Sequence, residues 1–74
     1  MMNFHTSLMI PSRFTEGGQD KEVGEMRGVL YPAIVGTELI YGEESYIVVA
    51  VRDEVLLRNT YRTLELALIN KKVY

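Results

Sequence analysis

The chain contains no cysteine and only one histidine among its 74 residues. Without cysteine it cannot form a disulfide framework or a thiolate metal site. One histidine cannot by itself supply a zinc site. The sequence therefore predicts neither a bound metal nor another cofactor. Its stability must come from the apolar core, with or without a partner chain.

Long hydrophobic runs are also absent. The longest uninterrupted apolar run covers residues 46–51, whereas a membrane-spanning helix needs about 20 apolar residues. Residues 1–14 contain neither a basic segment nor a long apolar segment of the kind found in signal peptides. We therefore expect a soluble, cytoplasmic protein.

Patterns typical of catalytic sites are missing as well. The neighbouring acids Glu43 and Glu44, and likewise Asp53 and Glu54, lie in expected turns. Adjacent side chains on extended backbone point in opposite directions, so neither pair forms a ready carboxylate dyad. His5 is expected on an outer face, and no serine stands in a G-x-S-x-G context. These features predict a protein that is not an enzyme.

The composition is that of a small globular domain. Hydrophobic residues make up 47% of the chain and charged residues 24%, which separates it from disordered proteins. We expect one domain over residues 1–74. A chain of this size buries only about 60% of its unfolded surface. A partner, or a second copy of the chain, would help to cover its core.

Several short segments have the pattern of β-strands. Phe4, Thr6, Leu8 and Ile10 alternate with more polar residues, which is the period of a strand with one buried face. Further strands are expected at 37–41, 46–52 and 55–58, with tight reversals at 42–45 and 53–54. Residues 29–35 predict an edge or bent strand, because Pro32 cannot donate a hydrogen bond within a sheet.

The C-terminal third permits two interpretations. Leu64, Leu66 and Leu68 alternate as in a strand, which we favour because residues 58–63 are poor helix formers. A helix over residues 55–70 is the alternative, because Leu57, Tyr61, Leu64 and Leu68 also fit a helical stripe. The favoured fold is mainly β, a small antiparallel barrel or curled sheet of five to six strands. One strand, a long loop and then hairpins is the general layout of SH3-like barrels.

A polar, glycine-rich stretch, FTEGGQDKEVGEMRG, occupies residues 14–28. It lacks the spacing of a phosphate-binding or EF-hand loop, and its acids outnumber its bases. We predict a long flexible loop at about 12–27 that offers its acids to a basic surface on a partner. Nearby tyrosines could add to that contact. The candidate partner-binding residues are Glu16, Asp20, Glu22, Glu25, Tyr31 and Tyr41.

Charge is distributed unevenly along the chain. The net charge is −2, and nine of the ten acidic residues lie in residues 1–54. We predict a non-catalytic module that binds another protein or a second copy of itself. A small inhibitor from a phage or mobile element would be such a protein. The alternative is single-stranded nucleic-acid binding through a basic, aromatic C-terminal segment. Its candidate residues are Arg58, Tyr61, Arg62, Lys71 and Lys72.

Overall fold

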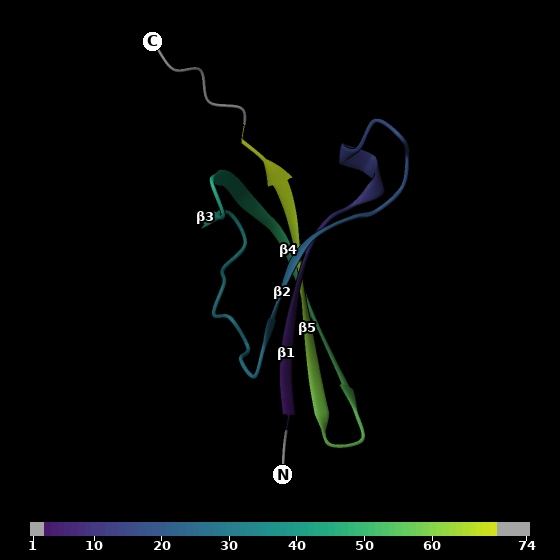
Figure 1. Ribbon diagram of the computed structural model, residues 1–74, viewed down its shortest axis with the longest axis vertical. Coiled ribbons are helices and arrows are strands. Elements are labelled where there is room, and N and C mark those ends of the chain that lie inside the picture. The colour runs from purple at the N-terminus through teal and green to yellow at the C-terminus, as the bar shows by residue number, and fades with distance from the viewer. Residues whose placement is uncertain (1–2, 70–74) are drawn as a thin grey trace.

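A computed structural model describes residues 3–69, which form a mainly β protein. Its strands are β1 (Asn3–Ile10), β2 (Lys21–Arg27), β3 (Glu38–Tyr41), β4 (Glu44–Leu56) and β5 (Asn59–Leu68). The five strands form one sheet in the order β2-β1-β5-β4-β3. This sheet curls into a half-barrel (Figure 1). The predicted curled sheet is confirmed, with five strands in the described part of the chain.

The concave face of the sheet carries the core. Thr6, Leu8 and Ile10 alternate along β1 and are buried, as their spacing predicted. Leu64 and Leu66 of β5 are completely buried beside them. The remaining buried apolar residues come from β3 and β4, namely Leu39, Tyr46 and Val48. The period of two in these strands therefore directs one row of side chains into the hollow of the half-barrel.

The sheet is mixed, whereas the sequence suggested antiparallel pairing throughout. β1 pairs with β5 in parallel, with Asn3 opposite Asn59 and Leu8 opposite Leu64. The other three strand pairs are antiparallel. A tight turn can join only antiparallel neighbours. Because β1 and β5 are distant in the chain, no turn constrains their relative direction, and the turn signals of the sequence did not reveal this pair.

The prediction of one long loop over residues 12–27 is wrong for much of that segment. Ser12–Phe14 form a 3₁₀ turn, and Lys21–Arg27 form the edge strand β2 against β1. A bulge interrupts the pairing, since Leu8 faces Gly24 while Met9 faces Glu22. The extra residue, Val23, breaks the period of two. The alternation that marks a strand is therefore absent from this part of the sequence.

Residues 29–35 were expected as an edge strand, and that expectation is also wrong. They form no strand but cross the concave face between β2 and β3. The Thr6 hydroxyl donates a hydrogen bond to the carbonyl of Val29 (2.7 Å) and accepts one from the Tyr31 N–H (2.9 Å). Tyr31 and Ala33 pack against the core from this side. Tyr31 and Ala33 thus close the core without joining the sheet, whereas Val29, Ile34 and Val35 are exposed.

The β3–β4 hairpin lies where the sequence placed it, but the next reversal does not. β4 continues through the expected turn at Asp53 and Glu54 to Leu56, and the chain reverses at Leu57 and Arg58. Asp53 stays in the strand because it lies opposite Arg62 and forms an ion pair with it. The acids that suggested a turn therefore belong to a cross-strand contact.

The C-terminal segment is the strand β5, so the helical alternative over residues 55–70 is wrong for the residues that the structure describes. β5 is held between β1 and β4. Alternating side chains on its concave side, Leu64 and Leu66, fill the centre of the core. In residues 3–69 there is no helix with the length and apolar character needed to cross a membrane.

Candidate functional site

Two adjoining cavities lie at the end of the half-barrel where β1 and β5 finish. Their volumes are about 370 and 620 Å³, and both are lined by Ile10, Lys21 and Leu68. One extends between β2 and β4, and the other lies against the turn that follows β1. We call the two together the end hollow. Its apolar lining consists of Ile10, Phe14, Val23, Tyr46, Ala67 and Leu68.

Three carboxylates also line the end hollow. Glu22 and Glu44 line the first cavity, and Glu16 lines the second. Within residues 3–69, none of these three carboxylates forms an ion pair. Among residues 3–69, Lys21 is the one basic residue that lines either cavity. The end hollow therefore combines an apolar floor with an acidic rim, and a basic, partly apolar group would complement it.

The predicted acidic residues separate into different environments. Glu16 and Glu22 lie at the end hollow. Asp20 instead accepts a hydrogen bond from the Ser12 N–H at 2.8 Å, which closes the intervening loop. Glu25 lies on the outer face of β2, where it contacts both His5 and Arg27. Two of the four predicted acids are thus available at the hollow, and two have contacts elsewhere.

The two predicted tyrosines face the core. Tyr31 packs over it from the crossing segment, and its carbonyl accepts a hydrogen bond from Arg62 at 3.0 Å. Tyr41 packs against the core from β3, with its ring directly over Gly24 of β2. Both side chains are partly buried. They hold the half-barrel together and do not form one surface with the acids.

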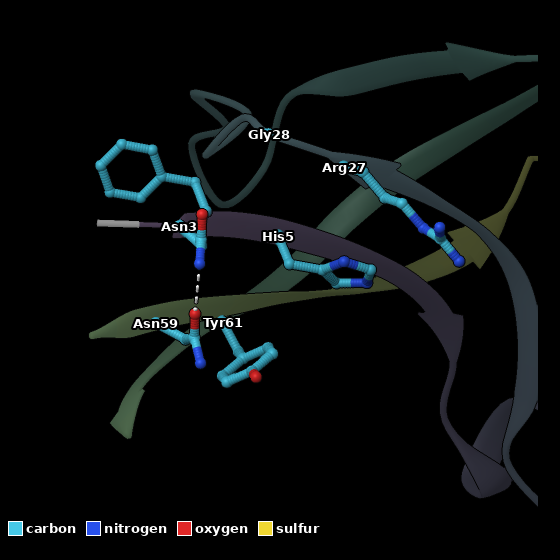
Figure 2. Close-up of a pocket in the computed structure, with 7 residues that line it drawn as sticks. Asn3, His5, Arg27, Gly28, Asn59 and Tyr61 are labelled. Carbon is cyan, nitrogen blue, oxygen red and sulfur yellow. Dashed lines mark hydrogen bonds between the residues drawn. The ribbon is translucent and has the colours of Figure 1, made fainter. Parts of the chain in front are cut away.

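A second, more polar pocket of about 340 Å³ lies near the start of β1 and β5 (Figure 2). The Asn3 side-chain amide donates a hydrogen bond to Asn59 Oδ1 at 3.1 Å. Beside this pair, the ring centroids of His5 and Tyr61 lie 6.1 Å apart, and the ring planes form an angle of 55°. Figure 2 shows Arg27 extending from β2 beyond these rings. Phe4 also lines this pocket, which therefore brings together amides, three aromatic rings and a guanidinium.

The charges of this polar pocket are partly balanced. Glu25 lies 3.3 Å from His5 Nε2 through one oxygen and 3.2 Å from Arg27 Nε through the other. The Arg27 side chain is nevertheless 82% exposed, and its terminal nitrogens form no hydrogen bond or ion pair within residues 3–69. The guanidinium can therefore still bind an anion while its Nε remains paired.

The residues of the nucleic-acid alternative are not gathered on one face. Tyr61 lines the polar pocket, whereas Arg62, the next residue of β5, points to the opposite face. Arg62 binds Asp53 through two hydrogen bonds, of 2.8 and 2.9 Å. The same contact lowers the pKa of Asp53 and raises that of Arg62. Arg58 lies at the β4–β5 turn, and Lys71 and Lys72 lie outside the described residues.

The β4–β5 turn exposes an apolar surface that lies outside the sites predicted from the sequence. Val55, Leu56 and Leu57 are 68, 57 and 89% exposed and precede Arg58. We call residues 55–58 the hairpin tip. Three consecutive exposed apolar residues are unusual unless they have a function. The signal was present as VLLR, but the reversal was expected four residues earlier, so these side chains were assigned to a strand.

The end hollow was equally hard to find from the sequence. Leu68 continues the alternation of Leu64 and Leu66, yet it is exposed because β5 ends beside it. Phe14 lies on the turn after β1 and is exposed at the same end. Only the strand pairing brings these residues together. No known protein family, no curated protein and no solved structure matches the chain. The SH3-like layout therefore stays a prediction.

Proposed function

We propose that this protein is a non-catalytic binding module that accepts an apolar, basic segment of a protein partner in the end hollow. The observation that carries the proposal is the combination of an apolar floor with carboxylates that have no ion-pair partner in the described chain. Aliphatic side chains of the partner would bury against Ile10, Val23 and Leu68. Lysine or arginine beside them would meet the acidic rim.

Each part of the hollow contributes differently. Burial of apolar surface gives about 25 cal/mol per Å² and provides most of the affinity. Exposed carboxylates contribute less to affinity but increase the association rate with a basic partner and disfavour an acidic one. Their effect weakens as salt screens the charges. Binding should therefore combine moderate affinity with a clear preference for positive charge.

Two peptides of equal apolar content test this function. One carries leucines flanked by arginines, and the other carries the same leucines flanked by glutamates. Amide chemical shifts of the labelled protein should change around Ile10, Val23 and Leu68 with the basic peptide only. The double variant Glu22→Lys, Glu44→Lys should reverse this preference. Equal binding of both peptides, or shifts confined to other surfaces, would contradict the proposal.

A matched control is available on β4. Glu54 is exposed and has no ion-pair partner in residues 3–69, and it lies at the far end of the strand from Glu44. Glu54→Lys changes the net charge in the same direction without touching the hollow. It should leave peptide binding at the hollow unchanged, which separates the local effect of the rim from a general effect of charge.

Single-stranded nucleic-acid binding is the second candidate function, and the polar pocket favours it. Tyr61 and His5 offer rings on which a base can stack, and the exposed Arg27 can contact a phosphate. Fluorescence anisotropy with a labelled oligonucleotide at low salt tests this function. Tyr61→Ala and Arg27→Ala should each weaken binding, whereas Arg13→Ala, on the turn after β1, should not. Absent or salt-insensitive binding would remove this candidate.

A further inference from the structure

The hairpin tip carries an exposed leucine in an unfavourable backbone conformation. Leu57 has φ of 58°, a region that L-residues rarely adopt and that tight hairpin turns usually fill with glycine or asparagine. The Leu57 side chain is 89% exposed, so contacts within its own chain do not explain its presence. Backbone strain of this kind is common at functional positions. A partner that contacts the leucine side chain would explain it.

The hairpin tip complements the end hollow, because it adds a positive charge to the aliphatic surface that both share. Val55, Leu56 and Leu57 present aliphatic surface, and Arg58 follows them directly with an exposed side chain. The hollow presents aliphatic surface and the carboxylates of Glu16, Glu22 and Glu44. Within residues 3–69, Arg58 forms no ion pair. Each surface therefore supplies the charge that is unpaired on the other.

We propose that the hairpin tip of one copy inserts into the end hollow of a second copy. The inference rests on the proposed function, because it names the segment that the hollow accepts. A cavity of about 150 Å³ is enough to hold a benzene molecule. The cavities of the hollow, at about 370 and 620 Å³, have room for several aliphatic side chains of the tip.

The positions of the two surfaces determine the kind of assembly. Strand β5 begins directly after the tip and ends at Leu68 in the hollow, so it spans the distance between them (Figure 1). Its ten residues correspond to roughly 30 Å. A rigid sheet of this length keeps a tip away from the hollow of its own chain. The contact therefore joins two different copies: it closes into a two-fold dimer where it is reciprocal and builds an open chain where it repeats head to tail.

Sedimentation equilibrium from micromolar to millimolar protein tests this assembly. The weight-average mass of the wild type should rise with concentration and should rise less at high salt. Leu57→Asp at the tip and Leu68→Asp at the hollow should each weaken association by about tenfold or more. Ile40→Asp is the matched control. Ile40 is 71% exposed on β3 and lines neither surface, so its replacement should leave the mass unchanged.

Mixing the two variants gives the decisive measurement. Leu57→Asp retains an intact hollow, and Leu68→Asp retains an intact tip. Together they should form a 1:1 dimer that does not grow further, because the two remaining surfaces are damaged. Circular dichroism confirms that both variants are folded; if Leu68→Asp is unfolded, the rim variant Glu22→Lys, Glu44→Lys replaces it in the mixture.

The outcomes separate the inference from the proposed function. A wild type that stays monomeric up to millimolar concentration, or whose mass is unaffected by Leu57→Asp, would overturn the inference. If the basic peptide still shifts the amides of the hollow in such a protein, the occupant is another protein and the proposed function stands. If neither the peptide nor a second copy binds, both proposals fail.

Discussion

The ring of Tyr41 on β3 lies directly over the backbone of Gly24 on β2, at the two edges of the sheet. A methyl group at Gly24 would be 2.5 Å from Tyr41 Oη and 2.6 Å from two ring carbons. Such contacts do not occur between real atoms, so the ring can rest there only because residue 24 has no side chain. This contact joins β2 and β3, the two edge strands of the sheet, and limits the opening of the half-barrel.

Gly24→Ala should therefore destabilise the protein by about 1–3 kcal/mol, because the ring must leave its position or the edges must separate. Chemical denaturation measures the change. Gly17→Ala is the control, since a methyl group there would meet no atom within 4 Å. When Tyr41 is already replaced by alanine, Gly24→Ala should no longer lower the free energy of unfolding by much. Equal costs in both backgrounds would show that the ring does not constrain this position.

A second prediction concerns the segment that crosses the core. Thr6 is completely buried, and its hydroxyl bonds both to the Val29 carbonyl and to the Tyr31 N–H. Thr6→Val keeps the shape of the side chain but leaves both backbone groups without that partner. We expect a loss of about 1–3 kcal/mol in the free energy of unfolding.

The matched control is Thr63→Val on β5, where the side chain of the half-buried threonine forms no hydrogen bond within residues 3–69. It should change stability little. Hydrogen exchange of the Tyr31 amide gives a local measurement, and exchange should accelerate in Thr6→Val beyond the global effect. An unchanged exchange rate relative to other core amides would show that Thr6 does not hold the crossing segment.

The core strands could be predicted from the sequence because their residues alternate without interruption. The alternation of Thr6, Leu8 and Ile10 predicted β1, and that of Leu64 and Leu66 predicted β5. The edge strand β2 could not be predicted, because the bulge at Val23 breaks its period and the contact with Tyr41 requires a glycine within it. Such constraints arise between distant segments and leave no local pattern.

The candidate sites were predictable only in part, for the same reason. The sequence predicted Glu16 and Glu22 as partner-binding residues, and both line the end hollow, but it did not predict the apolar floor beside them. That floor depends on Leu68 and Phe14 meeting at one end of the sheet. Likewise, Asp53 suggested a turn, because the sequence alone could not reveal its cross-strand partner Arg62. The role of Asp53 depends on its contact with Arg62, and the register of β4 against β5 places these two residues opposite each other.

The Asp53–Arg62 contact predicts how stability depends on pH. The hydrogen bonds from Arg62 lower the pKa of Asp53 below its ordinary value of 3.8. The contribution of this pair is therefore fully present above pH 3.8 and is lost as the pH falls through the lower, folded-state pKa. Urea denaturation of the wild type and of Asp53→Asn should differ near neutral pH and converge in acid.

Glu54→Gln provides the comparison for this measurement. It removes a carboxylate from the next position of β4, where no ion pair is present in the described residues. Its effect on stability at neutral pH should be smaller than that of Asp53→Asn. If both variants show the same difference from the wild type at every pH, the contact with Arg62 does not contribute to stability.

The last prediction separates the effect of Leu57 on the stability of the fold from its effect on association between copies. Leu57 adopts φ of 58°, which costs an L-residue about 1–2 kcal/mol and costs glycine little. Glycine loses about 0.5–1 kcal/mol through its greater freedom in the unfolded chain. Leu57→Gly should therefore leave stability unchanged or raise it by up to about 1.5 kcal/mol, as measured by thermal denaturation.

The same variant should lose concentration-dependent association, because the side chain that enters the hollow is gone. Stability and association would then change in different directions at one residue. A destabilised Leu57→Gly would mean that the side chain supports its own fold, despite being 89% exposed. A stable variant that still associates would show that Leu57 is not the part of the tip that binds. Only a stable variant that no longer associates agrees with a leucine kept in a strained turn for contact with another molecule.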